Sequence, residues 1–235
     1  MYGIATDCSG GGCGQAGLFD ITTKGVYTNL YLYPIIGGTN NEVPLSPLLL
    51  STNGTFYSVT EQGGTHQNGS FYSVSTTYSP FVSLVSASGI QTAKVGILGQ
   101  GFSVASVVKF NGVTATTVAR TGTTFLLATV PAGASTGNVT VTTGATTLTS
   151  NKAFKVRPTI SSFAPPSGPV GTSVIINGTG LTQTTKVTFN GTSATFTVNS
   201  DIKITATVPT SATTGKIQVT TKGGAINSAT SFTVN

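Results

Sequence analysis

The last two-thirds of the sequence is a duplication, and this constrains the fold more than any other feature. Gly-x-Gly and Phe-Asn-Gly motifs at 99–101 and 110–112 both recur 79 positions later, and the Thr-Val-Pro motif at 129–131 recurs 78 positions later. Because the same motifs return in the same order, the chain is predicted to contain one module twice, at residues 79–157 and 158–235.

Each copy has the pattern of a β-sandwich. Short runs of Val, Ile, Thr and Phe are separated by turn residues, and both copies contain Asn-Gly, at Asn111 and Asn190, a strong hairpin signal. We expect about seven short strands per copy, as in immunoglobulin-like sandwiches. The linker at 155–158 is short, so the second module follows the first with little freedom.

The second copy resembles a known family. It carries Pro-Pro-Ser-Gly at 165–168, Asn-Gly-Thr-Gly at 177–180 and Phe-Asn-Gly at 189–191, and over its whole length it is similar to IPT/TIG domains, which have an immunoglobulin-like fold. The first copy departs from the pattern at 86–89, where Ser-Ala-Ser-Gly replaces Pro-Pro-Ser-Gly. The resemblance implies extracellular spacing, ligand presentation or dimerisation, because bacterial members commonly serve as accessory modules of surface proteins.

Residues 1–78 differ in composition from the duplicated part. They contain all seven tyrosines, and their single lysine against four acids gives a net charge of −3. The remainder has ten Lys or Arg against Asp201, a net charge of +9. Both counts indicate a domain boundary near Ser79.

The N-terminal region contains two units of strand, Gly-rich loop and strand. Tyr2 corresponds to Tyr57 and Phe19 to Tyr72, which is typical of blade-like repeats of the propeller kind. These units resemble the GloVer tandem repeat of large secreted bacterial proteins. Two units cannot close a ring of blades, so we expect a piece of a longer array with open strand edges. The predicted fold class is therefore all-β: two propeller-blade-like repeats followed by two tandem immunoglobulin-like sandwiches.

The two cysteines, Cys8 and Cys13, flank a Ser-Gly-Gly-Gly loop. Such a flexible loop can close a small disulfide in an oxidising compartment, and free thiols are the alternative. A metal site is not expected, because no histidine or second cysteine pair completes a tetrahedral ligand set.

The sequence offers little for catalysis. His66 is the only histidine and lies in a polar loop, and the five acids are scattered singly, so neither a His-dependent triad nor a glycosidase carboxylate pair is predicted. No cofactor is expected. Calcium binding at Asp7 has little support, because its loop supplies a single carboxylate.

The basic residues of the duplicated part are spread singly, which favours solvated strand faces over a nucleic-acid surface. No apolar run is long enough to span a membrane.

These observations predict a non-enzymatic, extracellular or cell-surface protein. Only 7% of its residues are charged, far below the roughly 25% of ordinary domains, so little charge protects its strand edges from pairing. The main hypothesis is a structural or adhesive protein, a stalk or fibre subunit that associates through β-strand edges. Its expected partners are a second copy, bound through residues 1–78, or other surface proteins. The alternative is a carbohydrate-binding accessory module of a secreted protein, with Tyr57 and Tyr72 as the ligand-binding residues.

Overall fold

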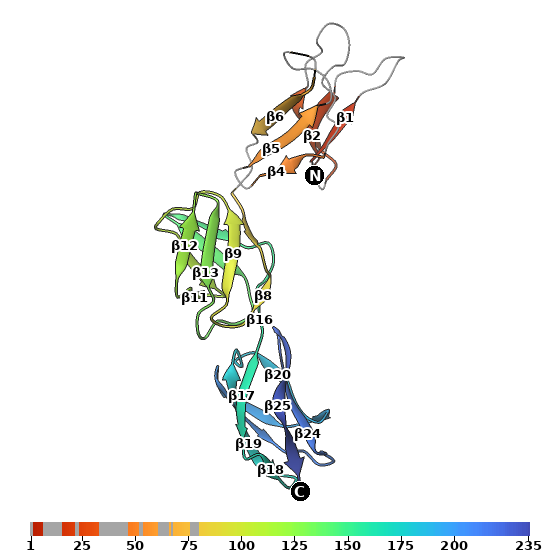
Figure 1. Ribbon diagram of the computed structural model, residues 1–235, viewed down its shortest axis with the longest axis vertical. Coiled ribbons are helices and arrows are strands. Elements are labelled where there is room, and N and C mark those ends of the chain that lie inside the picture. The colour runs from red at the N-terminus through yellow and green to blue at the C-terminus, as the bar shows by residue number, and fades with distance from the viewer. Residues whose placement is uncertain are drawn as a thin grey trace. The chain divides into compact units, whose positions relative to one another are not determined.

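The computed structural model describes residues 2–6, 16–21, 24–32, 47–51, 54–60, 66, 68–75 and 80–235. Every regular element in these ranges is a strand (Figure 1), so the predicted all-β class is confirmed. The chain divides into two units, Met1–Ser79 and Pro80–Asn235. Within the described ranges there is no helix with the length and hydropathy needed to cross a membrane.

The first unit contains two three-stranded antiparallel sheets. One sheet has the order β1-β2-β3 and the other the order β4-β5-β6. Their strands are β1 (Tyr2–Thr6), β2 (Ala16–Ile21), β3 (Tyr27–Leu32), β4 (Leu49–Leu50), β5 (Thr55–Thr60) and β6 (Ser70–Ser75).

The hairpins β1–β2 and β5–β6 have the same register. Tyr2 pairs with Asp20 as Tyr57 pairs with Ser73. The predicted correspondence of Tyr2 with Tyr57 therefore also describes how the two hairpins pair. In the first sheet, β3 pairs with β2, the second strand of its hairpin. In the second sheet, β4 pairs with β5, the first strand of its hairpin. The additional strand therefore lies on opposite sides of the two equivalent hairpins.

The second unit contains two sandwiches with the same topology. The first has sheets of order β12-β13-β9-β7 and β11-β10-β14-β15, and a parallel pair β8–β16. Its strands are β7 (Val82–Leu84), β8 (Ser88–Gly89), β9 (Lys94–Gly99), β10 (Val107–Phe110), β11 (Val113–Thr114), β12 (Val118–Thr121), β13 (Phe125–Thr129), β14 (Val139–Thr143), β15 (Thr146–Thr149) and β16 (Lys155–Val156).

The second sandwich repeats this order as β22-β23-β19-β17 and β21-β20-β24-β25, with β18 parallel to β25. Its strands are β17 (Thr159–Ala164), β18 (Ser167–Gly168), β19 (Ser173–Thr179), β20 (Thr184–Phe189), β21 (Thr192–Ser193), β22 (Phe196–Ser200), β23 (Lys203–Thr207), β24 (Gly215–Thr221) and β25 (Gly224–Val234). Each half of the duplication thus folds into the same two-sheet module.

The sequence difference at 86–89 leaves the strand pairing intact. Ser88–Gly89 forms a short strand parallel to β16, and Ser167–Gly168 forms the matching strand beside β25. The Ser-Gly shared by both copies makes these pairings. The Pro-Pro present only in the second copy is not needed for them.

Each sandwich has its own hydrophobic core. The core of the first contains an edge-to-face pair of Phe110 and Phe154, with ring centroids 5.2 Å apart. The second has the equivalent pair, Phe189 and Phe232, also at 5.2 Å. All four rings are fully buried. Because no buried residue is shared by the two clusters, the unit contains two cores rather than one.

Polar contacts join the two sandwiches within this unit. Gln91 donates from Nε2 to Asp201 Oδ2 at 2.7 Å. Gln183 donates from Nε2 to the Thr136 carbonyl at 3.1 Å and accepts from the Thr136 amide at 2.9 Å. A side chain of the second sandwich thus binds both backbone polar groups of one residue in the first.

Candidate functional site: an exposed aromatic sheet face

One face of the β4-β5-β6 sheet presents large apolar side chains to solvent. The rings of Tyr57 and Phe71 stack with centroids 5.7 Å apart and planes 18° from parallel. Phe71 is 71% exposed, and Leu49 and Val59 are also exposed. We call Leu49, Tyr57, Val59, Phe71 and Ser73 the aromatic face.

The strand register places these residues together. Side chains of directly paired residues lie on the same side of a sheet, and successive residues alternate sides. Tyr57 pairs with both Leu49 and Ser73, and Val59 pairs with Phe71. The five side chains therefore form two adjacent rows on one surface, and the surface has no charged member.

The opposite face of the same sheet is the packed one. Phe56, Ser58 and Thr60 are buried there, and the Thr60 hydroxyl accepts a hydrogen bond from the Ser70 amide at 2.9 Å. Tyr72 pairs with Ser58 and so belongs to this face.

The structure therefore separates the two predicted ligand residues. Tyr57 lies on the solvent-facing side with Phe71, whereas Tyr72 lies on the packed side. Phe71 was not singled out by the sequence analysis. Its strand, Ser70–Ser75, alternates polar and apolar residues except at the Phe71-Tyr72 pair, which signals that both sides carry a ring but not which side is open.

Of the remaining sequence candidates, the structure describes His66 but not the two cysteines. Cys8 and Cys13 lie outside the described residues, so their predicted disulfide stays a prediction. His66 is exposed. Among the described residues, no three His, Cys, Asp or Glu side chains gather in a group that could hold a metal ion.

Asp201, the single acid of residues 80–235, has structural contacts. Its carboxylate accepts hydrogen bonds from Gln91 at 2.7 Å and from the Thr182 hydroxyl at 2.8 Å. It also accepts a longer one, of 3.4 Å, from the Gly180 amide. These contacts hold a turn of the second sandwich and its junction with the first. The ten basic side chains of residues 80–235 are all exposed.

Comparison with known families bears on the second sandwich. Residues 158–234 match the model of the IPT/TIG domain. The second sandwich is an IPT/TIG domain. The resemblance predicted for this copy is confirmed, whereas the GloVer type of residues 1–78 stays a prediction. No curated protein matches the chain significantly.

Several solved structures are similar to this chain at low identity. A surface glycan-binding protein of Prevotella bryantii is 16% identical over 66% of this chain and 42% of its own, with a TM-score of 0.45. The SGBP-B protein of the Bacteroides ovatus mixed-linkage glucan locus, in complex with a heptasaccharide, is 17% identical over 79% of this chain and 54% of its own, with a TM-score of 0.30. The plexin A4 extracellular region is 15% identical over 100% of this chain and 30% of its own, with a TM-score of 0.34. This chain spans little more than half, or less, of each of these proteins.

Proposed function

We propose that this chain is a non-enzymatic, extracellular carbohydrate-binding accessory module. The aromatic face binds a neutral polysaccharide, and the two sandwiches serve as its scaffold. The observation that carries this proposal is the Tyr57–Phe71 stack, with Phe71 71% exposed, within a set of five paired residues of which none is charged.

The physical argument starts from the cost of exposing this face. Keeping a phenyl ring and two aliphatic side chains in water is unfavourable, and exposed apolar patches commonly mark interaction sites. A sugar ring offers C–H groups on its faces and hydroxyls at its edge. The C–H face covers an aromatic ring, and the edge hydroxyls can hydrogen-bond to neighbours such as Ser73.

The absence of charge on the aromatic face selects the type of sugar. An anionic polysaccharide gains most from Arg or Lys beside the ring, and the aromatic face offers none. The near-parallel rings of Tyr57 and Phe71 form a continuous surface rather than a closed pocket. Such a surface suits a section of a polymer chain better than a single free sugar.

The non-enzymatic part of the proposal rests on the acids. Hydrolysis of a glycoside requires two carboxyl groups on either side of the bond. Asp201 is bound to Gln91 and Thr182 in the second unit, and none of the five described residues of the aromatic face is an acid; Asp7, Glu42 and Glu61 lie outside the described residues.

Native affinity electrophoresis tests the binding. The full chain is run in gels containing single neutral polysaccharides, including xyloglucan and mixed-linkage glucan, which are named for solved structures of similar fold. We expect at least one polymer to retard the chain. Phe71→Ala should weaken that retardation about tenfold, which corresponds to about 1.4 kcal/mol.

Tyr27→Ala is the matched control. Tyr27 is also exposed and stacked on a phenyl ring, that of Phe19 at 5.2 Å, but it lies in the other sheet of the same unit. It should bind as the unchanged chain does. Equal loss in both variants, or retardation by none of the polymers, would contradict the proposal.

Self-association is a second candidate role. Among the described strands of the first unit, β4 and β6 lie at the two ends of their sheet, and an edge strand can pair with a strand of a second copy. A stalk or fibre subunit that assembles this way should change mass with concentration in light scattering. A constant monomer mass at high concentration would exclude this role.

A further inference from the structure

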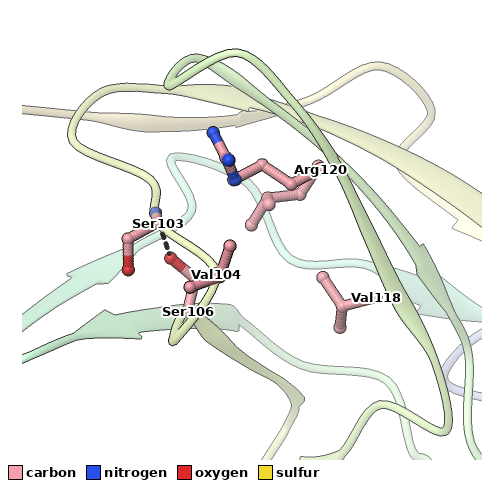
Figure 2. Close-up of a pocket in the computed structure, with 6 residues that line it drawn as sticks. Ser103, Val104, Ser106, Val118 and Arg120 are labelled. Atoms are coloured by element: carbon pink, nitrogen blue, oxygen red, sulfur yellow. Dashed lines mark hydrogen bonds between the residues drawn. The ribbon is translucent and has the colours of Figure 1, made fainter.

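The first sandwich contains a hollow of about 350 Å³ at the edge formed by β12. Figure 2 shows Val118 and Arg120 of β12 on one side and the 103–106 loop between β9 and β10 on the other. Leu126, which is fully buried, also lines the hollow.

The second sandwich carries larger apolar residues at the equivalent positions. The equivalent hairpins have matching registers, with pairs Val118–Ala128 and Arg120–Leu126 in the first copy and Phe196–Ala206 and Val198–Ile204 in the second. Phe196 and Val198 are partly buried and pack against the core of their sandwich. In the first copy a smaller Val118 replaces the phenyl ring and a charged Arg120 replaces the valine. The first sandwich therefore has less apolar bulk at these two positions than the second.

The lining of the hollow is mixed: Val104, Val118 and Leu126 are apolar, Ser103 and Ser106 are polar, and Arg120 is cationic. Arg120 is exposed and donates from Nη1 to the Gly122 carbonyl. Asp201, the single acid of residues 80–235, is bound elsewhere, so the Arg120 charge has no carboxylate partner in this unit.

A hydroxyl group adds a second donor at the rim. Ser103 Oγ accepts a hydrogen bond from the Ala105 amide at 3.1 Å, which leaves the hydroxyl hydrogen of Ser103 for a ligand. The Ser106 hydroxyl is already paired with that of Thr143 at 2.6 Å. The loop is thus held in place by Ser106, and its free donor is Ser103.

We propose that this hollow is a binding site for a carboxylate carried on a single ring. The ring enters above Leu126 and beside Val118, whose equivalent in the second copy is Phe196. The carboxylate accepts charge-assisted hydrogen bonds from the Arg120 guanidinium. The volume is at the lower end of the range of small-molecule sites, about 300–1,000 Å³. This site is independent of the aromatic face, because all its residues belong to the second unit.

Two sources share this chemistry, an aromatic acid and a uronic acid. Titrations of the ¹⁵N-labelled full chain with benzoate and with glucuronate separate them, and benzamide and methyl glucoside are the uncharged counterparts. We expect one of the two acids to shift the amide signals of residues 103–106 and 118–120 at millimolar concentration. The uncharged counterparts should leave those signals in place.

Two substitutions assign the contacts. Arg120→Gln should weaken binding of the acid roughly tenfold, while Lys109→Gln, which removes one exposed charge from β10 of the same sandwich, should have no effect. Val118→Phe introduces the residue type of the second copy. It should fill the hollow and abolish the shifts while the spectrum keeps its folded dispersion.

Three outcomes overturn the proposal: no shift at these residues with either acid, equal shifts with the uncharged counterparts, or binding that survives Val118→Phe in a folded protein. If Val118→Phe does not fold, the comparison of Arg120→Gln with Lys109→Gln decides the question.

Discussion

Truncating one core phenylalanine should destabilise one sandwich and leave the other intact. Phe154 and Phe232 occupy equivalent positions in the two copies, each fully buried and each 5.2 Å from a second ring. Because the two buried clusters share no residue, the effect of Phe154→Ala should be confined to residues 80–156 and that of Phe232→Ala to residues 159–234.

The expected magnitude is large for modules of this size. A buried Phe→Ala change costs about 3–5 kcal/mol from lost transfer energy and the cavity left behind. A module of about 78 residues has a free energy of unfolding of roughly 4–12 kcal/mol. The altered sandwich should therefore lose between about a quarter and all of its stability, and its melting temperature should fall by about 12 °C or more.

Amide hydrogen exchange followed by mass spectrometry measures both sandwiches in one sample. In Phe154→Ala, peptides from 80–156 should lose protection roughly a hundredfold or more, while peptides from 159–234 keep theirs. Val104→Ala, at a 90% exposed position of the first sandwich, is the control and should change little. Equal loss of protection in both sandwiches would refute the assignment of separate cores.

Two further predictions concern hydrogen bonds. Ser228→Ala should destabilise the second sandwich by about 1–3 kcal/mol in urea unfolding. The buried Ser228 hydroxyl accepts a hydrogen bond from the Ile217 amide at 3.0 Å and donates one to the Thr230 carbonyl. An unchanged unfolding midpoint would contradict this role. Gln183→Ala removes both contacts to the Thr136 backbone and should increase amide exchange at 136–137 by roughly tenfold without shifting the exchange of 204–206 in the second core. Unaltered exchange at 136–137 would show that these contacts add no stability.

Local sequence patterns were enough to predict the two sandwiches. The Asn-Gly turns place Asn111 and Asn190 in the left-handed region, at φ 45° and 44°, which this residue type tolerates. The motifs at 99–101 and 178–180 end β9 and β19. Such signals are local, and they survive in both copies, so the fold class followed from them.

The two proposed binding surfaces depend on contacts between strands and could not be predicted in the same way. Alternation shows that Phe71 and Tyr72 face opposite sides, but the open side is determined by what packs on the sheet. The hollow beside Arg120 is visible only after the registers of the two copies are aligned, because Val118 and Phe196 are both ordinary strand residues in the sequence.

Isothermal titration calorimetry tests the central claim most directly. The polysaccharide that slows the chain in the affinity gel is titrated into the unchanged chain and into variants of Phe71. If the ring of Phe71 is the contact, Phe71→Tyr should bind as the unchanged chain does, because the aromatic surface is kept, and Phe71→Ala should bind about tenfold more weakly. A Phe71→Ala chain that binds with unchanged affinity would contradict the assignment of the aromatic face as the carbohydrate-binding surface.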